Sequence, residues 1–331
     1  MKDLARQGTV MKRLLVGLLL LMLLPAGGDA VFAAGKNLKI AMILWRGETD
    51  AEKGFRDGLK ELGYSVQYIE MNAGQDRAEL GRLLREDLKP RLDGVDYVYV
   101  FGTTATVAVK SIVQDKTPVI FNIVADPVGA GVVRSMESSA GNIAGVTNEI
   151  PLALQIKTAL TVVPFKRLGF LFNPREKNSM LIRERLVEVA RPLGIEVVDL
   201  RSAPALDMLQ ENLQKLRDKT IAVDAVYLPA DSFLVSNAKL IGAELKAARV
   251  KSIAAIESYI DHGALMGVVP DYHQLGKAAA TIVHRHQGGQ KLQDMPVQAD
   301  RDPVLKINGA TGRLLGITIP ELVRKRAIVV E

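Results

Sequence analysis

Residues 98–128 of this 331-residue chain read VYVFGTTATVAVKSIVQDKTPVIFNIVADPV, a pattern that predicts the fold class. The apolar, β-branched run at 97–101 is too short for a buried helix and predicts a central strand of a parallel sheet. A helical pattern begins near Ala105, and Pro118 separates it from a second apolar run at 119–124. The stretch therefore predicts a β-α-β unit of an open α/β sheet.

The polar residues of this unit follow the ends of its strands. Gly102 permits a tight turn, and Thr103 or Thr104 is expected to cap the helix that follows. Asp126 comes directly after the second strand. Open α/β sheets bind ligands at the carboxyl ends of their strands, and the free N–H groups of a helix start favour an anion. Capping and turn formation alone would also explain these residue types.

Composition limits the possible classes of protein. The chain is 48% hydrophobic and 24% charged, and its length favours two domains over one. It has no cysteine, which excludes disulfides, thiolate metal sites, cysteine nucleophiles and a lipid-attachment cysteine. The formal charge is +6, but the basic residues are interspersed with acidic ones, so we expect no nucleic-acid binding.

The first 33 residues have the features of a secretory signal peptide. A basic pair precedes an uncharged apolar run at 14–24, which is shorter than the roughly 20 residues that span a bilayer. We expect cleavage after Ala33, with Ala30 as the alternative site and Met11 as an alternative start. An uncleaved membrane anchor is the other interpretation. Cleavage would release a soluble periplasmic protein that is not a lipoprotein.

Strands and helices alternate in two successive series, from 38–44 to 143–147 and again from Pro151 to 265–269. Among their helices we expect one at 51–62 capped by Thr49 or Asp50, one at 76–88 that ends before Pro90, and one at 233–248. Two such series predict two doubly wound, Rossmann-like lobes with a ligand between their carboxyl edges. A single polar residue at a strand end is usually structural, but six such positions on matching edges favour a cleft that binds a small polar molecule. The residues at these positions are Trp45, Arg46, Thr103, Thr104 and Asp126 in the first series and Asn173, Asp231, Glu257 and Ser258 in the second.

Motifs of catalysis and cofactor binding are missing from the sequence. The Gly129-x-Gly131 pair lacks the third glycine and the strand-to-helix context of a dinucleotide site. No phosphate-binding loop, nucleophile elbow or H-E-x-x-H motif occurs. His284 and His286 are two residues apart on a predicted helix and therefore diverge. We expect no cofactor, no metal and no enzymatic activity.

Five segments together resemble a known family. They are FGTTATVAVKS (101–111), TPVIFNIVADPVGAGVV (117–133), GNIAGVTNEIP (141–151), LGFLFNP (168–174) and LPADSFLVSN (228–237). They look like motifs of the periplasmic substrate-binding proteins of ABC transporters, in particular the type I family that includes the binding components of tryptophan and tyrosine importers. The resemblance implies two lobes joined by three crossover strands, a ligand trapped by hinge closure, and delivery to a membrane permease.

The domain prediction follows from the two series and the resemblance. We assign residues 36–147 and the helix at 274–286 to lobe one, and residues 148–273 to lobe two. The tail at 297–331 is assigned to neither lobe. We expect a monomer that partners an ABC permease. A sensory module that presents its ligand to a receptor and an extracytoplasmic enzyme are the alternatives.

The candidate site residues suit a zwitterionic ligand. We expect Thr103 and Thr104 to bind an anionic group and Trp45 to provide an apolar wall. An ammonium group or hydroxyl groups would bind to Asp126, Asp231 or Glu257. A sugar is less suited, since sugar sites usually need more aromatic residues, so we predict an amino acid or a related molecule.

Overall fold

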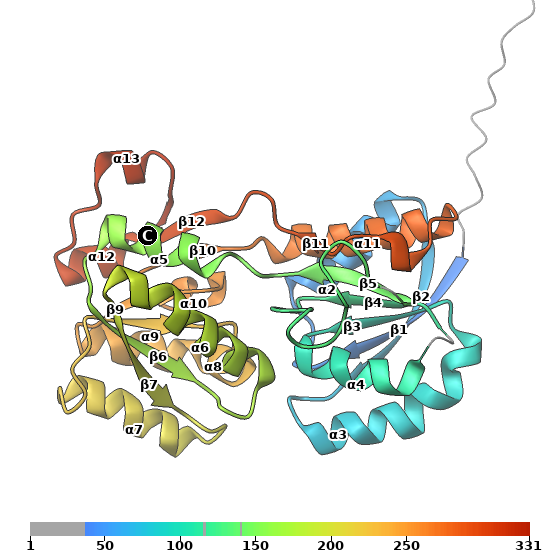
Figure 1. Ribbon diagram of the computed structural model, residues 1–331, viewed down its shortest axis with the longest axis horizontal. Helices are drawn as coiled ribbons and strands as arrows, with labels where there is room; N and C mark the ends of the chain where they lie inside the picture. The colour runs from blue at the N-terminus through green and yellow to red at the C-terminus, as the bar shows by residue number, and fades with distance from the viewer. Residues whose placement is uncertain (1–36, 115–116, 140) are drawn as a thin grey trace, which may run out of the picture. The chain divides into compact units, whose positions relative to one another are not determined.

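The structure is a computed structural model that describes residues 37–114, 117–139 and 141–331 (Figure 1). The predicted signal peptide at residues 1–33 lies outside these ranges. Within them, no helix is both long enough and apolar enough to cross a membrane.

A six-stranded parallel sheet contains the predicted β-α-β unit, and its strands follow the order β11-β5-β4-β3-β1-β2. In register, Leu44 of β1 pairs with Phe101 of β3, which pairs with Asn122 of β4, so these strands end together. All five residues of β3 are buried, as expected for a central strand. The bounds are β1 (Asn37–Leu44), β2 (Ser65–Asn72), β3 (Tyr97–Phe101), β4 (Val119–Asn122), β5 (Ile143–Thr147) and β11 (Gln298–Ala299).

A seven-stranded sheet follows the order β13-β12-β10-β9-β8-β6-β7, with only the β10–β12 pair antiparallel. The C-terminal tail thus supplies one short strand to the first sheet and two strands to the second. The predicted fold of two α/β lobes with mostly parallel sheets is confirmed. The bounds are β6 (Arg167–Phe172), β7 (Glu196–Arg201), β8 (Ala225–Leu228), β9 (Lys251–Ala254), β10 (Met266–Val269), β12 (Val304–Asn308) and β13 (Ile328–Val330).

Helices cover both faces of the first sheet. In Figure 1, α2 and α11 lie on one face and α3 and α4 on the other. Helix α11 packs along α2 and reaches β4 and β5, although it follows β10 of the second sheet in the chain. The bounds are α2 (Asp50–Glu61), α3 (Arg77–Arg82), α4 (Thr103–Val113) and α11 (Tyr272–Gln287).

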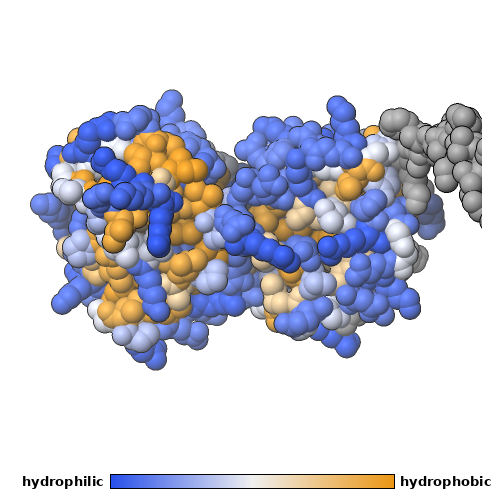
Figure 2. Space-filling model, turned by 90° about the horizontal axis from the view of Figure 1, so that it is seen from above, coloured by the Kyte–Doolittle hydropathy of each residue, from blue (hydrophilic) through white to orange (hydrophobic). Residues whose placement is uncertain are grey.

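The remaining helices belong to the second sheet, and apolar surface gathers on this part of the molecule (Figure 2). The exposed large apolar side chains of α5 and the C-terminal segment include Leu154, Leu314, Leu322 and Ile328. The bounds are α5 (Leu152–Val162), α6 (Lys177–Ala190), α7 (Leu206–Arg217), α8 (Ser232–Ser236), α9 (Ala238–Ala247), α10 (Glu257–Asp261), α12 (Gly309–Leu315) and α13 (Glu321–Arg324).

One observed helix start agrees with the sequence prediction, and another differs from it. Thr49 caps α2 in a capping box with Glu52, as the residue types predict. The expectation that Thr103 or Thr104 caps α4 is wrong. The cap is Gly102, with φ of 90° and no side-chain hydrogen bond, and both threonines lie inside the first turn. Glycine adopts this φ without strain, so the turn can be tighter than a capping threonine would allow.

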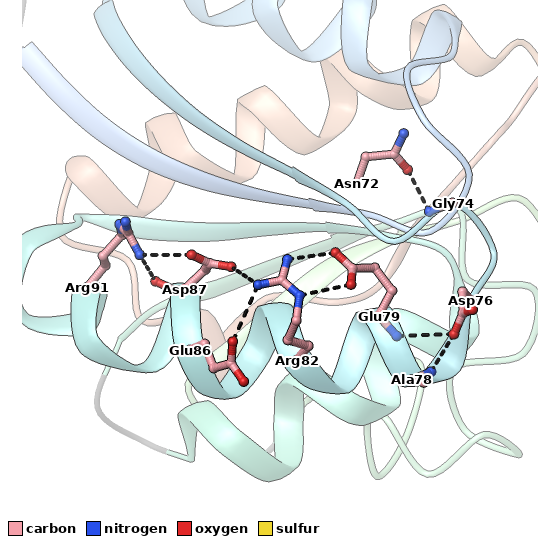
Figure 3. A network of polar contacts seen from close by, with 9 residues as sticks. All are labelled: Asn72, Gly74, Asp76, Ala78, Glu79, Arg82, Glu86, Asp87 and Arg91. Atoms are coloured by element: carbon pink, nitrogen blue, oxygen red, sulfur yellow. Dashed lines mark hydrogen bonds and ion pairs between the residues drawn. The ribbon is translucent and has the colours of Figure 1, made fainter.

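The helix after β2 also differs from the prediction, at its C-terminal end. Asp76 caps α3, and Arg82 forms ion pairs with Glu79, Glu86 and Asp87 (Figure 3). The chain then continues through a π-helical turn at Leu83–Leu88 and a 3-10 helix at Lys89–Gly94 instead of stopping before Pro90. Proline is tolerated there because it occupies the first turn of the new helix, where its missing N–H has no partner to lose.

Candidate functional site

A cavity of about 20 Å³ lies at the strand ends of both sheets. Trp45, Gly102 and Ile123 follow β1, β3 and β4 directly, so the common register of these strands brings them to one edge. The other residues around the cavity come from the segments after β5, β6, β8 and β10, and they include Asn148, Glu176, Asn178, Ser232 and Tyr272. We call this space the polar cavity.

Unpaired polar atoms concentrate at the polar cavity. Among the residues that the structure describes, the buried side-chain atoms without a hydrogen-bond partner are Trp45 Nε1, Asn148 Oδ1 and Asn178 Oδ1. All three residues line this one cavity. Leaving a buried polar group unpaired costs about 1–3 kcal/mol, so their coincidence at one place favours a ligand that would pair with them.

Glu176 adds a buried carboxyl group to the same cavity. It accepts hydrogen bonds from the backbone N–H and the hydroxyl of Ser232, at 2.9 and 3.0 Å. Burial and, second, the negative charge of Asp231 raise the pKa of Glu176 to about 8. The cavity therefore combines a proton-binding carboxyl group with amide oxygens and an indole N–H.

Ile123 forms part of the wall in a strained conformation. Its φ is 56°, a value that β-branched residues rarely adopt. The Oδ1 atom of Asn122 accepts its backbone N–H at 3.0 Å, and the Nδ2 atom of Asn122 donates to the hydroxyl of Tyr99. The Tyr99 hydroxyl in turn donates to Glu52 at 2.7 Å. This buried chain of hydrogen bonds holds the wall in place.

A second cavity, of about 30 Å³, adjoins the polar one and is mostly apolar. The two share Ala125, Asn148 and Ala230 in their walls. The hydroxyl of Tyr227 donates to Gln155 at 2.9 Å and provides one polar group there. Apolar residues around this cavity, which we call the apolar cavity, are Ile150, Leu152, Ile182 and Ala255.

A wider opening of about 560 Å³ lies on the other side of the polar cavity. Arg46 and Tyr272 line both spaces. The Arg46 guanidinium lies 5.1 Å from the ring centre of Phe101. Burial raises the pKa of Tyr272, and the positive charge of Arg46 has a smaller effect that lowers it. This cationic side chain therefore separates the polar cavity from the wide opening.

A family model described as ABC transporter substrate binding protein matches residues 40–331. The chain belongs to this family. The resemblance of its motifs to ABC substrate-binding proteins is thereby confirmed.

Two kinds of relatives agree with the family. A curated tyrosine-binding protein from Clostridioides difficile (strain R20291) is 26% identical over 286 residues, covering 85% of this chain and 81% of the relative. A crystal structure of an ABC domain in complex with L-Trp from Streptococcus pneumoniae is 27% identical, with a TM-score of 0.81, covering 89% of this chain and 100% of that one. A conserved domain protein from Vibrio cholerae is 26% identical, with a TM-score of 0.80 and coverage of 89% and 99%.

The residues that the sequence singled out in this substrate-binding protein divide into three groups. Trp45, Arg46 and Thr103 line the polar cavity, and Arg46 also lines the wide opening. Glu257 and Ser258 line the wide opening, and Glu257 is paired with Lys306. The others, which are not among the residues lining the polar cavity, are Thr104, Asp126, Asn173 and Asp231.

Three of these side chains are bonded to the protein itself. Asp231 is fully buried and accepts hydrogen bonds from the backbone of Asn173 (2.9 Å), the hydroxyl of Ser179 (2.6 Å) and the backbone of Leu234 (3.2 Å). Asn173 accepts from the N–H two residues later. Asp126 accepts the N–H of Gly129 at 2.8 Å. A ligand contact by these side chains stays a prediction, and the geometry gives them structural roles.

The sequence reasoning missed the residues that bring most polar groups to the cavity. Glu176 and Asn178 lie three and five positions after Asn173, and Ser232 directly follows Asp231. Asn148 and Tyr272 lie in segments that link the two sheets, and Asn148 Nδ2 donates to the Tyr272 hydroxyl at 3.2 Å. The sequence signal that could have identified them is their position just beyond the turn at the end of a strand. No group of three metal-ligating side chains occurs within the described ranges.

Proposed function

We propose that this substrate-binding protein binds a free α-amino acid with a large apolar or aromatic side chain. The observation that carries the proposal is the coincidence of all three unpaired buried atoms with Glu176 at one cavity. The ammonium group would pair with Glu176 and the amide oxygens of Asn148 and Asn178. Similarity to a protein named for tyrosine and to a structure containing L-Trp supports this ligand class.

The carboxylate would bind on the opposite side of the polar cavity. Gly102 and Thr103 begin helix α4, whose first N–H groups and positive dipole end favour an anion. The N–H of Trp45 and the guanidinium of Arg46 are further donors on this side. The apolar cavity next to Asn148 would then take the side chain of the amino acid.

We also propose that the two sheets separate to admit the ligand. Pockets for small molecules are roughly 300–1,000 Å³, far above the volumes of the polar and apolar cavities. Direct bonds join the two halves in the present arrangement: Gln75 donates to Ser236 at 2.8 Å, and Lys177 donates to the carbonyl of Ala130 at 2.9 Å. The first half comprises β1 to β5 with α11 and β11, and the second comprises the remaining elements.

We further propose that the protein works in the periplasm, where it delivers the bound amino acid to an ABC permease in the membrane. It would bind the amino acid without catalysing a reaction. Purified protein incubated with its amino acid should return it chemically unchanged. Reconstitution with the permease would test import directly, and uptake that does not depend on this protein would contradict the role.

The decisive test is titration calorimetry with L-tryptophan, L-tyrosine, L-phenylalanine and L-leucine. Two analogues serve as matched controls: tryptamine lacks the carboxylate, and indole-3-propionate lacks the ammonium group. We expect saturable binding of at least one amino acid and at least about tenfold weaker binding of both analogues, since each leaves buried groups unpaired. Equal affinity for an amino acid and its analogues would contradict the proposal, as would binding of a sugar alone.

Trp45 provides a second prediction because it is the single tryptophan of the chain. Its indole is 6% exposed and its Nε1 atom has no partner in the described structure. Trp45→Phe retains an aromatic ring but removes the indole N–H together with part of the ring system, so we expect about tenfold weaker amino-acid binding. In the unsubstituted protein, a non-fluorescent ligand such as L-phenylalanine should shift the indole emission with the affinity found by calorimetry. Trp45 would not belong to the ligand site if L-phenylalanine left the emission of the unsubstituted protein unchanged and Trp45→Phe bound amino acids with unchanged affinity.

A further inference from the structure

Glu176 presents a buried carboxyl group to the polar cavity without a cationic partner. The residue is 7% exposed, and its hydrogen bonds come from the neutral N–H and hydroxyl groups of Ser232. Within the described ranges, no lysine or arginine forms an ion pair with it. A carboxylate in such a place is costly, because burial disfavours the charged form.

The charged and titratable groups around Glu176 come from four other segments. Asp231 after β8 contributes a negative charge, whereas the positive charge of Arg46 after β1 has the smallest effect on Glu176. Tyr259 of α10 is buried and Tyr272 of α11 is partly buried, and loss of contact with water raises the pKa of each, so both stay neutral near physiological pH. The surroundings thus favour one shared proton on the two carboxyl groups.

That proton belongs on Glu176 and not on Asp231. Burial raises the pKa of Asp231 as well, but Asp231 accepts three hydrogen bonds, two of them from backbone N–H groups, and such donors favour its anion. Glu176 accepts from a single residue, and its pKa is raised to about 8 by burial and by the charge of Asp231. At neutral pH the carboxyl group of Glu176 is therefore protonated when no cation is next to it.

We propose that Glu176 gives up its proton to solvent when the ammonium group of an amino acid enters the polar cavity. This inference rests on the proposed function. No covalent bond of the ligand changes: the carboxyl O–H of Glu176 ionises, the proton leaves, and the carboxylate pairs with the ammonium group. The unpaired Oδ1 atom of Asn178 accepts a second ammonium hydrogen. The N-terminus of α6, which begins at Lys177, then stabilises the new anion.

This exchange has a specific thermodynamic signature. Each binding event near pH 7 should release close to one proton, because Glu176 is mostly protonated before binding and ionised after it. Affinity should rise by up to about tenfold per pH unit as the pH approaches about 8. Above that pH the affinity should level off, because Glu176 is already ionised before the amino acid binds.

The test is calorimetry with L-tyrosine or L-tryptophan in buffers of different ionisation enthalpy, repeated across pH. We expect a released proton for the unsubstituted protein and none for Glu176→Gln, whose weaker binding should also be independent of pH. Asp261→Asn is the control, since Asp261 is another carboxyl group of raised pKa and does not line the polar cavity. This variant should retain the proton release.

The outcomes separate the two proposals. Binding of an amino acid without proton release by the unsubstituted protein would overturn the exchange and leave the proposed function standing. Proton release that persists in Glu176→Gln would also overturn it, because another group would then be the source. Failure of every amino acid to bind would overturn both. The measurement on the unsubstituted protein does not depend on whether the variant folds.

Discussion

Asp231→Ala is expected to lower the free energy of unfolding by roughly 3 kcal/mol, even without ligand. The substitution removes the acceptor for two backbone N–H groups and the hydroxyl of Ser179, all buried. Each buried donor left unpaired costs about 1–3 kcal/mol, and release of the repulsion with Glu176 offsets part of the total. Chemical denaturation of the ligand-free variant measures the effect.

Asp76→Ala is the matched control for this prediction. Asp76 also caps a helix and accepts two backbone N–H groups, at 2.6 and 3.1 Å, but the bonds are exposed (Figure 3). Water can replace the lost acceptor there, so the cost should be about 1 kcal/mol. If Asp231→Ala proved as stable as the unsubstituted protein but bound amino acids more weakly, the ligand-contact role predicted from the sequence would be favoured instead.

The alternation of strands and helices, and the sheet edge at which the polar cavity lies, were predictable from the sequence. Short β-branched runs alternate with amphipathic segments, and the carboxyl ends of parallel strands must meet at one edge. Trp45 and Thr103 were found this way because they follow β1 and β3 within two residues. At such short distances from a strand, the backbone direction leaves little freedom in where a residue lies.

Residues further into the turns were not predictable by the same reasoning. Asn173 bonds to the backbone two residues later, a local alternative that Asn and Asp adopt often. The turn then brings Glu176, three positions on, to the cavity. Which residue of a turn faces a ligand depends on such local hydrogen bonds and on the opposite sheet, and neither is visible as a sequence period.

Contacts between helices that are far apart in the sequence were not predictable either. The α2–α11 pair joins segments more than 200 residues apart, and small residues at the contact do not identify their partner. One expected helix at 233–248 is two, α8 and α9, with Asn237 between them. The side chain of Asn237 donates to the carbonyl of Phe233. Apolar periodicity continues across this break and therefore conceals it.

Gly54→Ala is expected to destabilise the protein by roughly 3 kcal/mol through this helix contact. A Cβ atom on Gly54 of α2 would lie 2.0 Å from the backbone oxygen of His273 in α11. Gly276 of α11 approaches α2 from the other side, where its Cβ would lie 2.1 Å from the backbone oxygen of Ala51. Since backbone atoms on both helices are involved, no side-chain rotation relieves the clash and the helices must move apart.

Gly81→Ala distinguishes this effect from a general response to alanine. Gly81 is also a helical glycine, but its Cβ would meet only the flexible end of Arg85, at 3.1 Å. Alanine is the better helix former by about 1 kcal/mol, so this variant should be as stable as the unsubstituted protein or slightly more stable. Separation of α2 from α11 would also displace Tyr272, which begins α11 and lines the polar cavity. Gly54→Ala should therefore weaken amino-acid binding as well as stability, and equal unfolding curves for the two variants would contradict the close packing of the helices.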